Sequence, residues 1–119
     1  VYTDNGLYGI GESGAWGLLA ASGEAIKMFG EYLVGQDPLD IEHHWQYMYR
    51  FSHFRGAAVM GAISALDEAL YDIAGKFYGV PVYRLLGGKC RDKVRVYNHT
   101  AGRTEEELIE NAIKGKDAG

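Results

Sequence analysis

The chain has 119 residues, of which 47% are hydrophobic and 24% charged, a composition typical of one small globular domain. Its formal net charge of −4, with lysine and arginine scattered among the acids, argues against a nucleic-acid partner because phosphate binding needs a basic surface. No apolar run approaches the roughly 18–20 residues that span a bilayer, which argues against a membrane partner, and the single cysteine, Cys90, favours a reducing cytoplasm.

The first element in the chain is a predicted β-hairpin. The pair Asn5-Gly6 stands between two β-prone stretches, residues 1–3 and 7–10. Both residue types tolerate positive φ, which the tight turn of a hairpin needs. We therefore expect an antiparallel pair at the start of the chain.

A glycine motif follows at once. Residues 9–14 (GIGESG) match the pattern G-x-G-x-x-G, which in dinucleotide-binding folds joins a strand to the N-terminus of a helix inside a βαβ unit. Here the preceding strand belongs to an Asn-Gly hairpin, so the local sheet is antiparallel. The sequence favours a strand end and a turn over a nucleotide site.

Two helices come next. Apolar residues at near-helical spacing predict a helix over residues 18–33, which Gly35 ends. The pair Asp37-Pro38 is suited to a helix start, because Asp caps the first amides and Pro fits the first turn, and predicts a second helix to about Phe51. Residues 50–56 break the pattern and are predicted to form a loop.

The third helix has the clearest periodicity. A large apolar stripe and a small one run side by side, and the small stripe would let another backbone approach closely. Gly79 ends the helix, and a short helical turn is expected over residues 82–86. The large stripe comprises Val59, Ile63, Leu66, Leu70, Ile73 and Phe77, and the small one Ala58, Ala62, Ala65 and Ala69.

Near residues 89–92 the predicted architecture changes from a hairpin with helices to the beginning of an α/β fold. Residues 94–97 alternate in β-prone types and predict a strand, and Thr104 with Glu107 forms a capping-box pattern at the start of a helix over residues 104–117. A strand followed by a capped helix is half of a βαβ unit, which cannot close a parallel sheet alone.

Several polar clusters resemble sites but have simpler interpretations. Adjacent helical side chains point about 100° apart, so His43 and His44 cannot share one ion, and we interpret them as a solvated helix face. Asp67, Glu68 and Asp72 read as a polar face or an inter-domain contact. Cys90 lies in a charged turn and has no identifiable base partner, which favours an ordinary surface thiol.

Three residues are candidates for ligand binding. His53 and Arg55 lie in the aromatic loop before the third helix, where Arg55 could bind an anionic or polyhydroxylated ligand or could pair with a local acid. His99 follows the predicted strand, where polar residues build active sites in barrels, although it could equally cap the next helix.

Longer motifs carry a family resemblance. Residues 9–12 (GIGE), Asp37-Pro38, Trp45, and above all residues 61–76 (GAISALDEALYDIAGK) and 79–89 (GVPVYRLLGGK) resemble the capping domain of the mandelate racemase and muconate lactonizing enzymes of the enolase superfamily. The similarity is colinear over essentially the whole chain. Among subgroups the chain looks most like acid-sugar dehydratases of the mannonate or galactonate type.

The resemblance implies an α+β capping domain over residues 1–91, formed by an antiparallel β-hairpin and a helix bundle with its first strand missing. Residues 92–119 would begin a TIM-like (β/α) barrel. The first residue is Val1 rather than Met and the last ones read as a helix C-cap, so we expect a piece of a longer enzyme.

The same resemblance implies a magnesium-dependent reaction in which the proton α to a carboxylate is removed and water is lost. The carboxylate ligands of Mg²⁺ and the bases would lie beyond Gly119, so no catalytic or metal-binding residue is expected in this chain. The loop predicted over residues 50–56, which carries His53 and Arg55, matches the family's second specificity loop, and residues 96–99 (VYNH) resemble a segment whose histidine contacts substrate.

We therefore expect a cytoplasmic homo-oligomer that acts on small-molecule sugar acids. Two alternatives stay open on the sequence. One is a racemase, epimerase or cycloisomerase of the same superfamily, and the other is a non-catalytic capping or interaction module.

Overall fold

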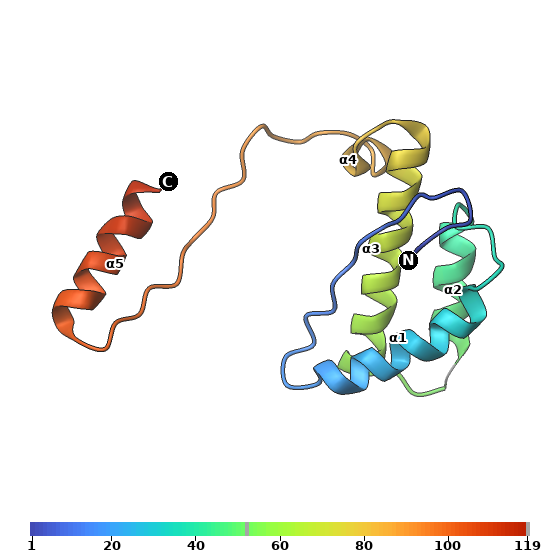
Figure 1. The fold of residues 1–119 in the computed structure, drawn as a ribbon, viewed down its shortest axis with the longest axis horizontal. Helices are drawn as coiled ribbons and strands as arrows, with labels where there is room; N and C mark the ends of the chain where they lie inside the picture. Colours follow the sequence, from blue (N-terminus) through green and yellow to red (C-terminus); the bar gives the residue numbers. More distant parts are fainter. Residues whose placement is uncertain (52, 119) are drawn as a thin grey trace. The chain divides into compact units, whose positions relative to one another are not determined.

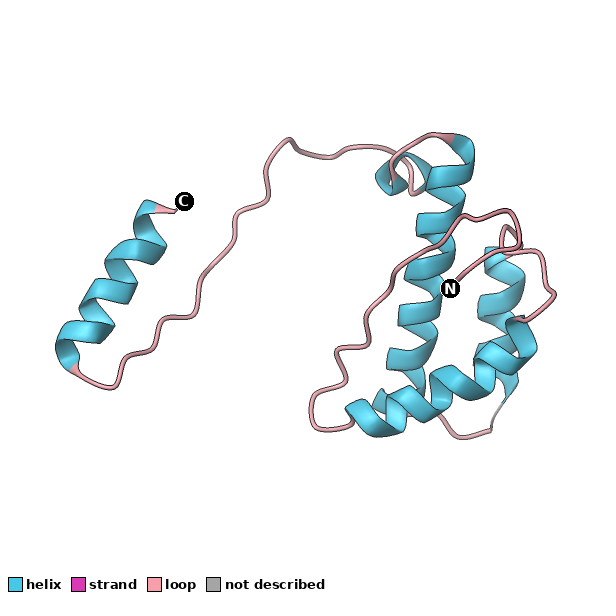
Figure 2. Ribbon diagram, in the orientation of Figure 1, coloured by secondary structure: helices cyan, strands magenta, loops and turns pink. Residues whose placement is uncertain are grey.

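The structure, a computed structural model, describes residues 1–51 and 53–118. Over these residues the chain forms helices and loops, and no strand is present (Figure 2). The chain divides into two compact units, Val1–Lys89 and a second that begins at Cys90. The helices are α1 (Leu19–Leu33), α2 (Ile41–Phe51), α3 (Ala57–Tyr78), α4 (Val82–Leu85) and α5 (Glu105–Asp117) (Figure 1).

Helix α3 is the centre of the first unit. Helices α1 and α2 pack against it through a buried cluster in which Phe29 of α1 and Met48 of α2 meet Ala62, Ile63 and Leu66 of α3. Ile63, Leu70 and Ile73 are at most 1% exposed, which confirms the predicted apolar stripe over most of its length. Removing these side chains from water is the main favourable term in the folding of this unit.

Phe77 is an exception to the predicted stripe. Its side chain is 53% exposed and lies edge-to-face with Tyr78 at a ring-centroid distance of 5.1 Å. The buried residues of α3 end at Gly75, nearly one turn before the helix does. Periodicity identifies the face of a helix but not how far its neighbours reach, so the prediction of a buried Phe77 was wrong.

The small stripe of α3 receives the N-terminal segment. A Cβ atom placed on Gly9 would lie 1.9 Å from the carbonyl oxygen of Ala69, and one on Gly11 would lie 1.8 Å from that of Ala65. Only residues without a side chain fit at such distances. The prediction that another backbone approaches the small stripe is therefore confirmed, and the glycine motif supplies that backbone.

The predicted hairpin is reduced to a single antiparallel bridge between Tyr2 and Tyr8. The Thr3 amide donates to the Leu7 carbonyl at 2.9 Å, and the turn contains Gly6 at φ +86°. Beyond Gly9 the chain turns to α3 for its hydrogen bonds, so no strand forms, and the predicted β-hairpin is not confirmed.

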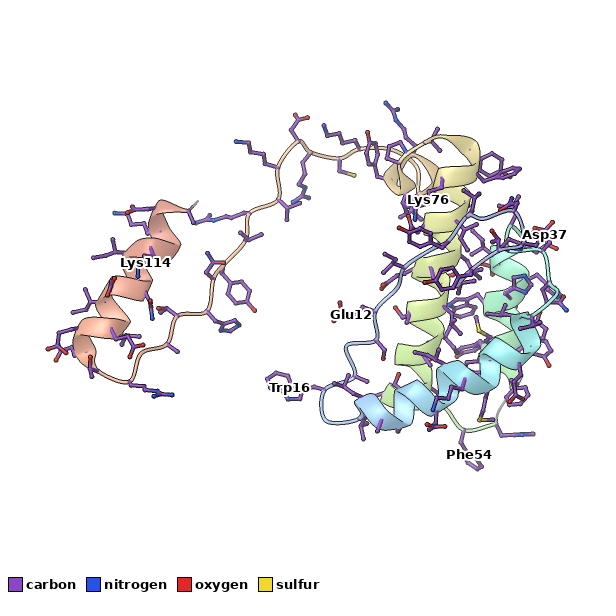
Figure 3. The ribbon with its side chains drawn as sticks, viewed as in Figure 1. Glu12, Trp16, Asp37, Phe54, Lys76 and Lys114 are labelled. Atoms are coloured by element: carbon purple, nitrogen blue, oxygen red, sulfur yellow. The ribbon has the colours of Figure 1, made fainter. Side chains whose placement is uncertain are left out.

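The acids of α3 bind this segment in place of a neighbouring strand. The amide of Ile10 donates to Asp72 Oδ2 at 3.0 Å, and the amide of Glu12 donates to Glu68 Oε2 at 3.1 Å. Lys76 Nζ donates to Asp72 Oδ2 at 2.8 Å and to the Tyr8 carbonyl at 2.6 Å, and Figure 3 labels both Glu12 and Lys76. Glu68 and Asp72 therefore bind the N-terminal segment within the first unit, and they are more than a polar face turned to solvent.

Two acids five residues apart on α3, Asp67 and Asp72, have opposite pKa shifts. The hydrogen bond from Lys76 lowers the pKa of the Asp72 carboxyl, and the bond from the Ile10 amide adds to this effect. Burial raises the pKa of Asp67, and the negative charges of Glu42 and Glu68 raise it further. The fold therefore stabilises the ionised form of Asp72 and disfavours the ionised form of Asp67.

The second helix begins later than the sequence indicates. Asp37 and Pro38 form a turn in which Asp37 Oδ1 accepts from the Leu39 amide at 2.9 Å, and α2 starts at Ile41. Asp and Pro favour turns as well as helix starts, so the motif alone placed the boundary three residues too early. The predicted loop 50–56 is found at residues 53–56, while Arg50 and Phe51 belong to α2 and Ser52 lies outside the described residues.

The second unit contains one helix and an extended lead-in. Thr104 caps α5, since its Oγ1 accepts from the Glu107 amide at 3.2 Å, which confirms the predicted capped helix. Residues 94–97 form no strand, and Val94, Val96 and Tyr97 are 65–81% exposed. A strand needs a partner for its amides and carbonyls, and the described residues offer none, so the barrel unit is not confirmed.

We expect Gly11→Ala to destabilise the chain by about 2 kcal/mol or more, because the new methyl group meets backbone atoms that cannot move away. Gly14→Ala is the matched control: a Cβ atom there has nothing within 4 Å. The control should change the free energy of unfolding by no more than about 0.5 kcal/mol. Equal urea midpoints for the two variants would show that the close approach does not exist.

We also expect the two acids of α3 to respond oppositely to amidation. Because the folded pKa of Asp72 lies below its unfolded value, its contribution is present above about pH 4 and is lost as the pH falls through the folded pKa. Asp72→Asn should cost about 1 kcal/mol at pH 7, a figure reduced for partial exposure, and less at pH 3. Asp67→Asn should be neutral or stabilising at pH 7, because ionised Asp67 is disfavoured in the fold. Thermal melts at both pH values test this, and a destabilised Asp67→Asn variant would contradict it.

Candidate functional site

The candidate residues His53 and Arg55 lie together in the loop between α2 and α3. Arg55 Nε donates to the carbonyl oxygen of Tyr49 at 2.5 Å, and its guanidinium carbon lies 4.1 Å from the centroid of the Tyr49 ring. The last carbonyls of a helix lack intrahelical partners and carry a partial negative charge. Arg55 therefore binds the C-terminal end of α2 through both the backbone and the side chain of one residue.

These contacts bear on the alternatives that the sequence left open for Arg55. Within the described residues Arg55 forms no ion pair with a carboxylate, so pairing with a local acid is not its role there. Its Nε is occupied, and its guanidinium carbon lies over the Tyr49 ring. Arg55 can therefore offer its positive charge and its terminal amino groups to an anionic or hydroxylated ligand.

His53 and Phe54 are both exposed on the same loop. Phe54 is 88% exposed and is labelled in Figure 3, where it projects away from the helices. The N-cap of α3, Gly56, offers no side-chain cap, so backbone geometry alone ends the loop. The loop therefore presents an imidazole, an aromatic ring and a guanidinium within three consecutive residues.

His99 lies in the second unit, five residues before Thr104. Its ring is exposed and packs edge-to-face with Tyr97 at a centroid distance of 5.2 Å. The alternative that His99 caps the next helix is wrong, because the side-chain cap of α5 is Thr104. The candidate residues thus divide between the units, two in the first and one in the second.

His44 is buried, whereas the sequence predicted it on a solvated face of the second helix. Its side chain is 1% exposed, so the interpretation as a solvated helix face is wrong for His44, while His43 is exposed as expected. Nε2 lies 2.7 Å from the Asp37 carbonyl and Nδ1 lies 2.9 Å from the Tyr32 hydroxyl. A carbonyl can only accept, so Nε2 carries the hydrogen and Nδ1 accepts from Tyr32.

The spacing around His44 contained the signal for its burial. His44 is three residues after Ile41 and four before Met48, which places it on the inward stripe of α2. Its two hydrogen bonds join α1, the turn at Asp37 and α2. His44 is therefore a structural residue of the first unit, satisfied at both ring nitrogens.

A groove of about 620 Å³ in the first unit is separate from the loop. It lies between the N-terminal residues, the end of α1 and the start of α2, and its lining is mostly apolar, with Lys27 as its cationic residue. Neither His53 nor Arg55 lines it. The groove and the candidate loop are therefore different features of this unit.

The described residues contain no metal centre and no membrane span. In residues 1–51 and 53–118 no three His, Cys, Asp or Glu side chains are grouped so that they could hold a metal ion. Over the same residues, no helix combines the length and the apolar character that crossing a bilayer requires. Within the part of the chain that the structure describes, no group of side chains fits a resident magnesium ion.

Comparison with known proteins gives a consistent family. A model of the mandelate racemase / muconate lactonizing enzyme N-terminal domain matches residues 1–87. A D-galactonate dehydratase of Verminephrobacter eiseniae is 45% identical over 120 residues, covering all of this chain and 31% of that protein. A D-mannonate dehydratase of Caulobacter vibrioides is 42% identical over 121 residues, with 100% and 30% covered.

Solved structures agree with the sequence relatives. A putative dehydratase from Zymomonas mobilis has a TM-score of 0.84 at 35% identity, covering all of this chain and 34% of that one. An enolase from Pantoea ananatis with bound D-gluconate and Mg has a TM-score of 0.68 at 33% identity, covering 94% and 33%. The chain thus spans about a third of the length of the relatives that it matches.

We expect His44→Leu to lower the free energy of unfolding by about 1–3 kcal/mol, because it leaves the buried Asp37 carbonyl and Tyr32 hydroxyl without their partner. His43→Ala is the matched control on the exposed neighbour and should stay within about 0.5 kcal/mol of the parent. Urea unfolding of both variants is the measurement. A His44→Leu variant as stable as His43→Ala would mean that His44 is not buried in this network.

Proposed function

The chain belongs to the mandelate racemase / muconate lactonizing enzyme family, whose N-terminal domain it matches over residues 1–87, and from this premise we propose that it is part of an acid-sugar dehydratase. The observation that carries the proposal is the set of relatives. D-galactonate dehydratases match all of this chain at 41–45% identity, and a D-mannonate dehydratase does so at 42%. The substrate class that this supports is a small sugar acid.

The proposed reaction removes the proton α to the substrate carboxylate, which gives an enediolate, and then expels the β-hydroxyl as water. Mg²⁺ in the whole enzyme would supply electrostatic stabilisation of the negative charge that develops. No group among the described residues fits that ion, and about two thirds of each relative lies outside the match. We assign the metal ligands and the bases to that remaining part.

We propose that residues 1–91 are the capping domain of this enzyme and that residues 92–119 begin its barrel. The compact unit Val1–Lys89 and the family match over residues 1–87 support the first assignment. The exposed, alternating apolar residues of 94–97 and the capped helix α5 support the second, because a β-prone segment followed by a helix is the repeating unit of such a barrel. The single cysteine, which is exposed, supports a reducing cytoplasm.

The proposed role of this chain is to hold the substrate rather than to transform it. Arg55 brings a positive charge that no carboxylate of the described chain neutralises, and an arginine binds carboxylate and hydroxyl oxygens through its terminal amino groups. His53 lies in the same loop, and His99 follows the segment proposed as the first barrel strand, where barrels build their sites. We propose these three as substrate-binding residues.

The reaction class can be tested with the whole enzyme that contains this chain, incubated with D-galactonate and D-mannonate and Mg²⁺ in D₂O. We expect a 2-keto-3-deoxy acid to form, with loss of the α-proton signal and of one hydroxyl. Exchange or inversion at the α-carbon without loss of water would instead identify a racemase or epimerase. Absence of any exchange would support a non-catalytic module.

In the same enzyme we expect Arg55→Ala and His99→Ala each to lower kcat/KM by about ten- to a hundredfold, the loss of one hydrogen bond to a charged group. Both variants should melt within a few degrees of the parent, because both residues are exposed. Arg50→Ala and His43→Ala are matched controls, since both residues are exposed on α2. Unchanged kinetics, or a collapse in melting temperature, would remove Arg55 and His99 from the substrate site.

A further inference from the structure

Three side chains form a stack that leads from the core to the loop. The rings of Trp45 and Tyr49 are 4.8 Å apart at an interplanar angle of 13°, as residues four apart on one helix allow. The guanidinium of Arg55 lies over the Tyr49 ring at 4.1 Å. An aromatic face attracts a cation because its quadrupole is negative there. The stack therefore ends on the one cationic side chain of residues 53–56.

The two contacts that Tyr49 makes with Arg55 act in different directions. The carbonyl oxygen of Tyr49 accepts a hydrogen bond from Nε, and the guanidinium carbon lies over the Tyr49 ring. A guanidinium held at Nε by a hydrogen bond and at its central carbon by a ring loses much of its freedom to rotate. The terminal amino groups, which lie at the opposite edge from Nε, keep a defined direction.

The base of the stack belongs to the core. Trp45 and Tyr49 are half-buried and pack against the cluster in which α1, α2 and α3 meet. Tyr47 is on the same helix but stacks on Tyr32 of α1 instead, with ring centroids 3.7 Å apart and an interplanar angle of 13°. The position of the Arg55 guanidinium is therefore linked to the rigid part of the unit, although the loop itself is exposed.

We propose that Tyr49, supported by Trp45, is a positioning residue for Arg55 that orients its terminal amino groups toward the substrate. The inference rests on the proposed function of Arg55. An arginine is among the side chains that lose most rotamer freedom when they bind. A stack that fixes the guanidinium before binding removes part of that loss, so Tyr49 acts on substrate affinity and leaves the chemical step unchanged.

Steady-state kinetics of the whole enzyme on its acid-sugar substrate test this. Tyr49→Leu should raise KM about two- to tenfold with little change in kcat, which corresponds to the loss of one exposed cation–ring contact, since the backbone carbonyl remains. Tyr49→Phe keeps the ring and should keep the parent KM. Tyr47→Leu is the matched control, because it removes a stacked tyrosine of the same helix that does not contact Arg55.

A double-mutant cycle separates this inference from the proposed function. If Tyr49 acts through Arg55, Tyr49→Leu should add nothing to the KM of Arg55→Ala. An effect of Arg55→Ala with none of Tyr49→Leu, or additive effects of the two, would overturn the positioning role alone. No effect of either would overturn the substrate role of Arg55 as well. If Tyr49→Leu fails to fold, Tyr49→Met, which is longer and apolar, replaces it in the same cycle.

Discussion

The close approach of residues 9–12 to the alanines of α3 is the constraint on which the first unit depends. Gly9 and Gly11 lie against backbone carbonyls of α3, where a methyl group does not fit. This proximity places the amides of Ile10 and Glu12 at the carboxylates of Asp72 and Glu68. One face of α3 is thereby closed by backbone, and the neighbouring face packs against α1 and α2. One contact therefore joins three features of the sequence: the glycine motif of residues 9–14, the alanine stripe of α3, and the acids Glu68 and Asp72.

The helices could be predicted from the sequence because their signals are local. The periodicity of α3, its end at Gly79 and the Thr104 cap of α5 each depend on residues a few positions apart, and each was found as expected. The strands could not be predicted in this way, because a strand forms only when a neighbouring strand pairs with its amides and carbonyls. Residues 94–97 have the composition of a strand but pair with no strand among the described residues, and the chain after Gly9 forms its hydrogen bonds with α3 instead.

The candidate site could be predicted by residue type but not by geometry. The loop carrying His53 and Arg55 was evident from its break in periodicity, whereas the contact of Arg55 with Tyr49 depends on how the chain folds back over the end of α2. His44 was misjudged for a related reason. A histidine counts as polar in a pattern, yet two hydrogen bonds let it occupy an inward position as stably as an apolar residue.

The account divides the work of the proposed enzyme: this chain orients the substrate through Arg55, and the remainder supplies metal and bases. A crystal structure of the whole enzyme with a bound sugar acid is the most direct test. The account predicts a terminal amino group of Arg55 within about 3.2 Å of a substrate oxygen, with the guanidinium still stacked on Tyr49. An Arg55 turned to solvent, or paired with a carboxylate of the protein while substrate is bound, would contradict it.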